Sequence, residues 1–307
     1  MIDQNRKQMK VLLNFFLKII GAGNLLNSIA KAGTDDEKFN QIIRRNRRVD
    51  VKRLPKLILE NYNVSEFDVE GYPLFMMKNR NKSSEKIIFY FHGGAYVVGP
   101  NLLQWLMVKK LASLAGSDFA LLDYPKIPEA QAIKTMKVSI ESYKIIADRY
   151  GANNIIFLGD SAGAGLALAL VMELDALGEN LPENLVLFSP WLDVSMDNPE
   201  SYDYDKNDIL LNCNGLKLCG YRYAGDLDLH HPWVSPFYGN LDNLPPATIF
   251  ASTSEVFWPD IRNFCRKANL IGRNIELITG QGLPHDYPLL YMFPEGKKAL
   301  EYVKTIL

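Results

Sequence analysis

The stretch IIFLGDSAGAGLALALVMEL, residues 155–174, decides how this chain folds. It opens with four apolar residues, which are typical of a buried strand, and it ends in an alanine- and leucine-rich run, which is typical of a helix. Between them, residues 159–163 form a G-x-S-x-G pattern centred on Ser161. The five residues alone are a weak signal. A strand leading into them and a helix leaving them predict the tight turn of a nucleophile elbow at the edge of a sheet.

This turn gives Ser161 the surroundings that a nucleophile needs. Gly159 and Gly163 remove side chains that would collide with the strand and the helix, and the helix dipole favours negative charge that develops at the serine. An ordinary N-cap serine and a phosphate-binding loop are the alternatives. A dinucleotide fingerprint starting at Gly163 fails because Leu168 replaces its third glycine, and no Walker lysine follows. The pattern therefore predicts a nucleophilic serine.

Strand and helix patterns alternate on both sides of this motif. Apolar runs predict further strands at residues 87–91, 119–124, 185–188, 248–251 and 275–278, preceded by a hairpin of residues 64–69 and 72–77. Helical patterns occur at residues 102–115, 130–150, 162–177 and 259–271. The alternation indicates an α/β fold with a mostly parallel central sheet and helices on both faces.

Two regions depart from this alternation, and both are expected to belong to a helical cap. Residues 1–60 have helical patterns, with Thr34 as the N-cap of a capping box that Glu37 completes. Residues 195–224 are rich in Tyr, Asp and Asn and have no strand pattern. The predicted organisation is an N-terminal part of the cap at residues 1–60, a catalytic core at residues 61–194 and 225–307, and a lid insertion at residues 195–224.

Two groups of side chains in the expected cap allow more than one interpretation. A basic run is most simply the solvated face of a helix, with contact to an anion or a membrane surface as the alternative. It consists of Arg44, Arg45, Arg47, Arg48, Lys52 and Arg53. Four lid tyrosines either wall an apolar pocket or pack the lid onto the core. They are Tyr202, Tyr204, Tyr221 and Tyr223.

The composition excludes several classes of protein. The chain has 307 residues, 34 basic and 35 acidic side chains and a net charge of −1, which argues against nucleic acid as a partner. Its 48% of hydrophobic residues exclude a disordered chain, and its length supplies a core that needs no metal or disulfide. Cys213, Cys219 and Cys265 fit no common zinc spacing and are interpreted as reduced thiols of a cytoplasmic protein. Apolar residues at helical spacing within residues 11–20 favour an amphipathic helix over an export signal, and no membrane span is expected.

A serine nucleophile also needs hydrogen-bond donors for the negative charge that forms on the substrate oxygen. His92-Gly93-Gly94 follows the predicted strand at residues 87–91, and its glycines let the backbone approach a substrate closely. The amides of this segment, with that of Ala162 next to the serine, are therefore the predicted oxyanion hole.

The general base is predicted from the positions of the four histidines. His92 belongs to the glycine segment, and His230 and His231 lie in a polar loop after the lid. His285 follows the final strand, and it is expected to accept the serine proton and return it to the leaving alcohol. Its neighbour Asp286 is expected to point away into solvent.

Two carboxylates compete for the role of triad acid. Glu255 lies just past the strand at residues 248–252, at the edge where parallel sheets place active-site groups. Asp260 directly follows Pro259, and an acidic residue there stabilises the first turn of a helix. Glu255 is therefore the predicted acid, and Asp260 is expected to support the loop.

These motifs together resemble the hormone-sensitive-lipase-like branch of the α/β-hydrolase family, in its small bacterial esterase form. The matching stretches follow the family's order: HGGAYVVG (92–99), DYPKIPEA (123–130), GDSAG (159–163), FSPWLDVS (188–195), YAGDLDL (223–229), SEVFWPD (254–260) and LPHDYPL (283–289). The resemblance implies acyl-enzyme chemistry without a metal or an organic cofactor. The residues that it implies are the triad Ser161, Glu255 and His285, oxyanion donors at Gly93, Gly94 and Ala162, and supporting residues His92, Asp160 and Asp260.

The chain departs from the family pattern at three positions. Ala95 replaces the usual third glycine after the histidine, Ile127 stands where the D-Y-x-x-A-P-E pattern has alanine, and Glu255 is aspartate in many relatives. The first departure is expected to change the shape of the pocket more than catalysis, and the second lies in a structural segment.

The leading prediction is a cytoplasmic serine hydrolase that cleaves small-molecule carboxylic esters with short acyl chains. An amidase or peptidase with the same triad is one alternative. A non-catalytic small-molecule-binding protein on this fold is the other. The sequence leaves the natural substrate and a homo-oligomer open.

Overall fold

The computed structural model describes residues 24–51, 54–81 and 83–307, so the helix expected within residues 11–20 lies outside the described residues. In the described chain, eight strands form one sheet in the order β1-β2-β4-β3-β5-β6-β7-β8. Their bounds are β1 Tyr62–Val69, β2 Tyr72–Asn79, β3 Ile87–Phe91, β4 Asp118–Leu122, β5 Ile155–Asp160, β6 Asn184–Phe188, β7 Ala247–Ser252 and β8 Ile275–Gly280. β2 runs antiparallel to β1 and β4, whereas β3 to β8 run parallel to one another. The predicted α/β fold with a mostly parallel sheet is confirmed.

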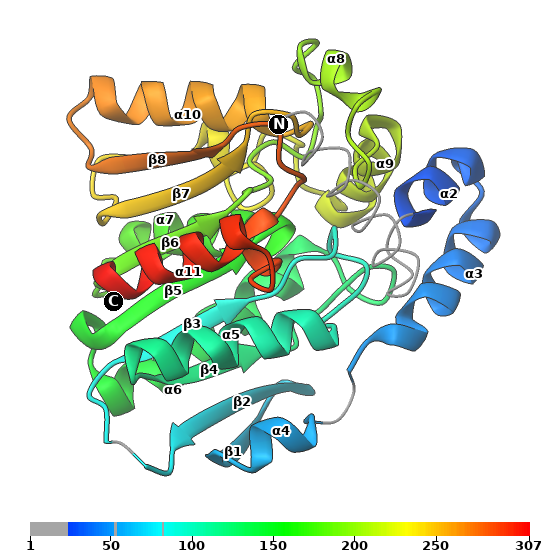
Figure 1. Ribbon diagram of the computed structural model, residues 1–307. Coiled ribbons are helices and arrows are strands. Elements are labelled where there is room, and N and C mark those ends of the chain that lie inside the picture. The colour runs from blue at the N-terminus through cyan, green and yellow to red at the C-terminus, as the bar shows by residue number, and fades with distance from the viewer. Residues whose placement is uncertain (1–23, 52–53, 82) are drawn as a thin grey trace.

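The central strands are apolar along most of their length because helices cover both faces of the sheet (Figure 1). Successive side chains of a strand point to opposite faces, so Phe89 and Phe157 belong to one core and Tyr90 and Leu158 to the other. Helices α6 (Ala132–Tyr150), α7 (Ser161–Ala176) and α10 (Trp258–Leu270) contribute to the first core. Helices α5 (Leu102–Ala115) and α11 (Pro294–Ile306) contribute to the second.

The hairpin predicted near the N-terminus is present as β1 and β2, with Val69 opposite Tyr72. Its two turn residues, Glu70 and Gly71, have φ angles of +53° and +90°. Positive φ at both central residues is typical of the two-residue turns that match the twist of a hairpin. Through its other edge, β2 pairs antiparallel with β4.

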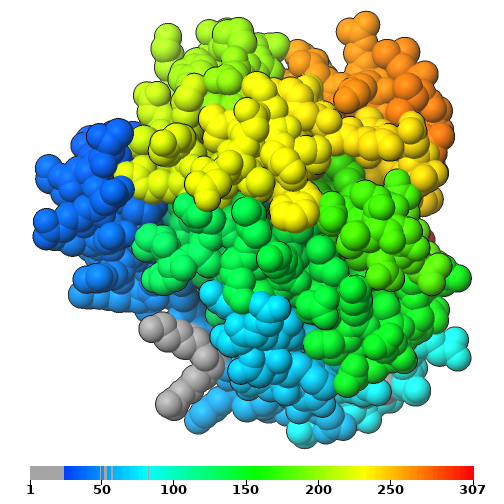
Figure 2. All heavy atoms as spheres, turned by 180° about the vertical axis from the view of Figure 1, so that it is seen from behind, coloured from blue at the N-terminus to red at the C-terminus, as the bar shows by residue number. Residues whose placement is uncertain are grey.

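Helices from the two sequence regions of the expected cap lie side by side. The N-terminal part contains α2 (Leu25–Ala32), α3 (Asp36–Asn46), a short 3-10 turn at Arg47–Val49 and α4 (Lys56–Leu59), and the insertion after β6 contains α8 (Ser201–Asp205) and α9 (Cys213–Ala224). A Cβ atom at Gly215 of α9 would lie 2.3 Å from the carbonyl oxygen of Leu26, so a glycine is required for α2 to pack this closely. Figure 2 shows the N-terminal helices (blue) at the rim of the molecule, against the yellow-green insertion.

The capping box predicted at the start of α3 is wrong by one residue. Asp35, not Thr34, is the N-cap, and its carboxylate accepts a hydrogen bond of 3.0 Å from the backbone N–H of Lys38. Asp35 has the extended backbone of an N-cap, and aspartate fills that position as well as threonine does.

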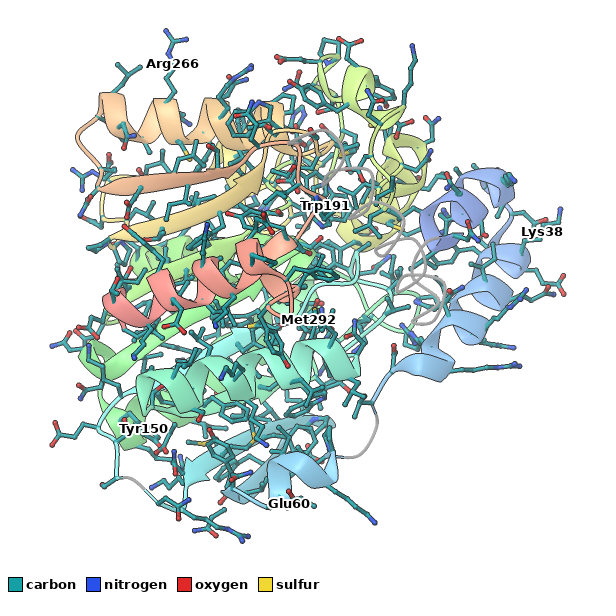
Figure 3. All side chains as sticks on the ribbon, viewed as in Figure 1. Lys38, Glu60, Tyr150, Trp191, Arg266 and Met292 are labelled. Carbon is teal, nitrogen blue, oxygen red and sulfur yellow. The ribbon has the colours of Figure 1, made fainter. Side chains whose placement is uncertain are left out.

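Side chains divide sharply between the outside of the molecule and its interior. Lys38, Glu60 and Arg266 point outward in Figure 3, whereas Trp191 lies inside, between the sheet and the cap. Trp191 stacks on Phe257 with 5.8 Å between the ring centroids. No helix in the described ranges is long and apolar enough to cross a membrane.

Candidate active site

The nucleophile elbow joins β5 to α7, and Ser161 is the first residue of the helix. Its φ of +52° lies in the left-handed region that residues other than glycine rarely occupy. A Cβ atom at Gly159 would lie 2.7 Å from the backbone of Ala164, and one at Gly163 would lie 2.2 Å from the carbonyl oxygen of Phe91. Both glycines are therefore required for the turn to fit between its own helix and the end of β3.

The structure brings the three predicted triad side chains together at the carboxyl edge of the sheet. The Nε2 atom of His285 lies 3.0 Å from Oγ of Ser161, and its Nδ1 atom lies 2.6 Å from Oε2 of Glu255. The other carboxylate oxygen of Glu255 accepts a 2.9 Å hydrogen bond from the backbone N–H of Ser252 at the end of β7. Phe257 packs edge-on against the His285 ring. These contacts can fix the ring in the tautomer whose Nε2 accepts a proton from the serine.

Burial and charge act in opposite directions on these groups. Burial raises the pKa of the Glu255 carboxyl, although its hydrogen bond and charge interaction with His285 act the other way. For His285, burial works against the charged ring, but the facing carboxylates of Asp286 and Glu255 outweigh it and raise its pKa well above the usual value. The imidazole is therefore a stronger base than an exposed histidine.

The prediction that Asp286 points into solvent is wrong. Its side chain is buried, and Oδ2 lies 3.1 Å from Nε2 of His285, the nitrogen that also faces Ser161. Asp286 has a φ of +54°, and its backbone N–H donates to Oγ of Ser189. This left-handed backbone turns the side chain back toward the ring. Burial raises the pKa of Asp286 to about 7.

The glycine segment after β3 lies directly against Ser161. A Cβ atom at Gly93 would lie 2.3 Å from Oδ2 of Asp160 and 3.0 Å from Cβ of Ser161. Gly94 has a φ of +128°, and a Cβ atom there would lie 2.2 Å from the carbonyl oxygen of Val98. Gly93 therefore lies next to Ser161, whose neighbour Ala162 is the third predicted oxyanion residue, and glycine is required at both loop positions.

His92 and Asp160, predicted to support the site, form its buried floor. The Asp160 carboxylate accepts hydrogen bonds from the hydroxyl of Tyr90 and from Nε2 of Gln104. The Tyr124 hydroxyl donates to the carbonyl oxygen of His92, and the two rings stack with 4.2 Å between their centroids. These bonds hold the first residue of the oxyanion segment on the core side.

The pocket beside Ser161 encloses about 180 Å³ and is walled by leucines rather than by tyrosines. Its leucines are Leu25, Leu26, Leu103, Leu210, Leu211, Leu216, Leu289 and Leu290. Tyr223, the fully buried one of the four lid tyrosines, packs against Tyr96 with 3.6 Å between the ring centroids. Among the described residues, the charged groups that line the pocket are Asp50, Asp160 and Asp286, with His285 and no Lys or Arg.

The remaining candidates lie away from Ser161. Asp260 is in the first turn of α10, as predicted, and accepts a 2.7 Å hydrogen bond from Nδ2 of Asn198. His230 and His231 lie in the loop between α9 and β7. No group of three or more His, Cys, Asp and Glu side chains within the described chain is placed to hold a metal ion.

Sequence reasoning missed the leucine wall and the position of Asp286. The leucines come from five separate segments that approach one another only in the folded chain. The direction of the Asp286 side chain depends on its positive φ angle, which cannot be read from its position next to His285 in the sequence.

Comparison with known proteins places the chain in a family. A family model described as the α/β-hydrolase fold matches residues 88–289. An esterase of Acinetobacter venetianus is 30% identical over 221 residues, which cover 71% of this chain and 73% of that protein. An acetyl-hydrolase of Streptomyces hygroscopicus is 28% identical over 224 residues, which cover 72% and 75%.

Solved structures agree with this placement. An esterase/lipase from an uncultured bacterium superimposes with a TM-score of 0.74 at 26% identity, over 90% of this chain and 98% of that chain. An esterase described as a member of the bacterial hormone-sensitive lipase family has the same fold, with a TM-score of 0.76 at 23% identity over 92% and 95% of the two chains. The chain belongs to the α/β-hydrolase family.

Proposed function

We propose that the chain is a carboxylic ester hydrolase that uses Ser161 as its nucleophile, His285 as its base and Glu255 as the acid that orients the base. The observation that carries the proposal is the continuous chain of contacts from Oγ of Ser161 through both ring nitrogens of His285 to Glu255. Activation of a serine hydroxyl by an oriented imidazole is the general requirement for acyl transfer.

The reaction would proceed in two steps with one base. In acylation, Oγ of Ser161 attacks the ester carbon while Nε2 of His285 takes the serine proton, and the same proton then passes to the leaving alcohol. The charge that forms on the carbonyl oxygen is met by backbone amides of Gly93, Gly94 and Ala162. In deacylation, His285 activates a water molecule that releases the acid and restores the serine.

The pocket supports esters with short, uncharged acyl chains as substrates. Leucines supply most of its apolar wall, and its volume of about 180 Å³ lies below the range of about 300–1,000 Å³ that is typical of ligand pockets. Because three aspartates line it and its described lining includes no Lys or Arg beside His285, an anionic acyl group would be repelled. Residues 1–60 and 195–224 would act as the cap over this pocket.

The location of the protein is part of the proposal. Cys213, Cys219 and Cys265 are buried and unpaired. Free thiols in the interior suit a reducing compartment, which supports a cytoplasmic enzyme.

Hydrolysis of p-nitrophenyl esters from acetate to octanoate, beside matched p-nitroanilides, tests this proposal. We expect the highest kcat/KM with the short esters, little turnover of the anilides, and covalent labelling of Ser161 by a fluorophosphonate. Ser161→Ala should lose at least about 10³ in kcat while keeping its fold. Labelling of another serine, or anilide turnover that matches ester turnover, would contradict the proposal.

A further inference from the structure

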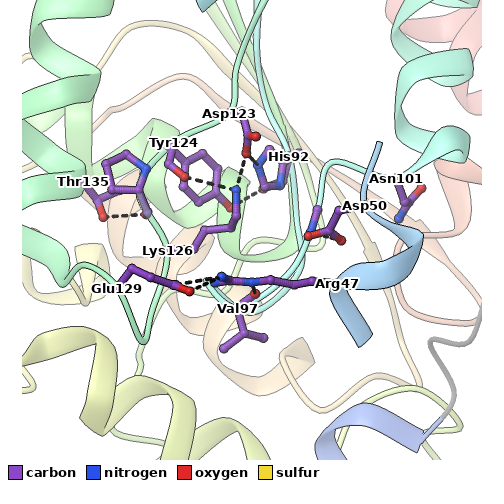
Figure 4. A network of polar contacts seen from close by, with 12 residues as sticks. Arg47, Asp50, His92, Val97, Asn101, Asp123, Tyr124, Lys126, Glu129 and Thr135 are labelled. Atoms are coloured by element: carbon purple, nitrogen blue, oxygen red, sulfur yellow. Dashed lines mark hydrogen bonds and ion pairs between the residues drawn. The ribbon is translucent and has the colours of Figure 1, made fainter. Parts of the chain in front are cut away.

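The basic run in the cap is not uniformly a solvated helix face. Arg44, Arg45 and Arg48 are exposed, as the simplest interpretation predicts, whereas Lys52 and Arg53 lie outside the described residues. Arg47 differs from all of these, because its side chain is only 20% exposed and extends into the core (Figure 4).

Arg47 uses each nitrogen of its guanidinium to join two loops of the core. Its Nε donates to the carbonyl oxygen of Val97 at 2.7 Å, and one terminal nitrogen donates to the carbonyl oxygen of Ile127 at 2.6 Å. The other terminal nitrogen pairs with the Glu129 carboxylate at 2.7 and 2.8 Å. Val97 lies in the loop that carries the oxyanion residues, and Ile127 lies in the loop after β4.

Two further contacts bind the same segment to the oxyanion loop. The Asp50 carboxylate accepts a 2.9 Å hydrogen bond from the backbone N–H of Gly99, and the backbone N–H of Val51 donates to the carbonyl oxygen of Pro100 at 2.8 Å. Residues 47–51 therefore run along the loop from Val97 to Pro100. We call this segment the strap.

The oxyanion loop needs support from outside because it contains no regular structure of its own. Gly94, Ala95 and Tyr96 all have positive φ angles. The carbonyl oxygen of Gly94 accepts hydrogen bonds from the N–H groups of Val97 and Val98, so the turn that presents Gly94 closes on the residue that Arg47 holds. A movement of Val97 would therefore be passed directly to Gly94.

We propose that Arg47 is a positioning residue for the oxyanion hole, acting through Val97 from outside the pocket. The inference rests on the proposed function, because it assigns Arg47 to the stabilisation of the tetrahedral intermediate that Ser161 forms. Preorganised donors are effective because they do not have to reorient when charge develops. The strap keeps the loop in that arrangement before substrate binds.

The proposed role predicts which kinetic constant should change. Loss of a complete oxyanion donor costs about 10²–10³ in kcat, and a donor that is only misaligned should cost less. We therefore expect Arg47→Ala to lower kcat by about 10- to 100-fold. KM for a p-nitrophenyl ester should change little, because the leucine wall is not altered.

The test compares turnover with binding of an analogue of the tetrahedral intermediate. In an alkyl trifluoromethyl ketone, Oγ of Ser161 adds to the ketone carbon, the serine proton passes to His285, and the carbonyl oxygen becomes an oxyanion. For Arg47→Ala in the full chain, Ki of this ketone should rise by the same factor by which kcat/KM falls. A purely structural role would lower the unfolding temperature without this matched change.

Three variants serve as comparisons. Arg45→Ala removes an exposed arginine of the same run and should leave kcat and Ki unchanged. Glu129→Gln weakens the ion pair but keeps both loop carbonyl contacts, so it should lose less than about threefold. Arg47→Lys should recover little, because an ammonium lacks the planar fork that reaches two carbonyl groups.

Several outcomes would overturn the inference. They are an unchanged Ki beside a lowered kcat for Arg47→Ala, equal losses in Arg47→Ala and Arg45→Ala, or equal losses in Arg47→Ala and Glu129→Gln. If Arg47→Ala does not fold, Arg47→Met, which keeps the aliphatic stem, takes its place in the same comparison. Failure of the proposed function itself would appear differently, as ester hydrolysis that survives in Ser161→Ala.

Discussion

The loops after β7 and β8 each bring a buried carboxylate to the same imidazole, yet the two carboxylates are held differently. Glu255, after β7, has one oxygen bonded to the N–H of Ser252 and the other to Nδ1 of His285. Asp286, after β8, has one oxygen near Nε2 of His285, and its other oxygen is buried with no hydrogen-bond partner among the described residues.

This difference separates their roles. A carboxylate with hydrogen bonds to both oxygens keeps its charged form stabilised throughout a reaction, whereas one with an unbonded buried oxygen depends on the facing imidazolium. Glu255 can therefore orient the ring, while Asp286 competes with Ser161 for Nε2 and favours a proton there. The nearby charge of Asp160 acts to raise the pKa of Asp286, and the charge of Asp208 acts to raise the pKa of Glu255.

Glu255→Gln should have the largest effect of the three carboxylate variants. The amide no longer accepts reliably from Nδ1–H, so the ring loses its productive tautomer, and we expect kcat to fall by about 10³–10⁴. Steady-state hydrolysis of p-nitrophenyl acetate at pH 8, with circular dichroism to verify the fold, measures the loss. An equal loss in Asp286→Asn at that pH would remove the distinction between the two loops.

The pH dependence of activity distinguishes the second carboxylate. Nε2 must be unprotonated to accept the Ser161 proton, and the pKa of His285 is raised, so wild-type kcat/KM should rise with pH at values above ~6.5. Asp286→Asn removes the charge that favours the protonated ring, and its acid limb should move to lower pH by about one unit or more. Asparagine tolerates the left-handed backbone at this position, so the loop should be preserved. A pH profile identical to that of the wild type would contradict this role.

Asp260→Asn should have the smallest effect on turnover, with kcat/KM within about twofold of the wild type, because Asp260 does not contact the triad. Burial raises the pKa of Asp260 to about 6, so the folded protein binds more protons than the unfolded chain between about pH 4 and pH 6. Its contribution to the unfolding free energy therefore falls as pH rises through that window. The variant should not show this decrease, so it should be at least as stable as the wild type at pH 8. If Asp260 only stabilised the first turn of α10, the variant would instead be less stable.

Thermal unfolding of wild type and Asp260→Asn from pH 4 to pH 8 measures this effect. A variant that unfolds at lower temperature at pH 8 would show that the charged carboxylate stabilises α10 more than its burial costs.

The elbow was predictable from sequence because its constraints act between neighbouring residues. Strand β5, the G-x-S-x-G pattern and the start of α7 lie within one short stretch, and a Cβ atom at Gly159 would collide with Ala164 only five residues later. The collision at Gly163 is different, because it is with the distant carbonyl oxygen of Phe91. His285 and Glu255 were predictable in the same way, because each follows the carboxyl end of a recognisable strand of a parallel sheet.

Asp286 and Arg47 were not predictable, because their contacts join segments far apart in the chain. The backbone N–H of Asp286 is held by Ser189, 97 positions earlier, and the guanidinium of Arg47 reaches Val97 and Ile127, 50 and 80 positions later. Pattern and composition describe a residue's neighbours along the chain. The sequence by itself determined the sheet, the elbow and the order of serine, acid and base. Only the tertiary structure decided which second carboxylate faces His285 and which arginine contacts the loop that contains Val97, because burial and hydrogen-bond partners exist only once distant segments have packed together.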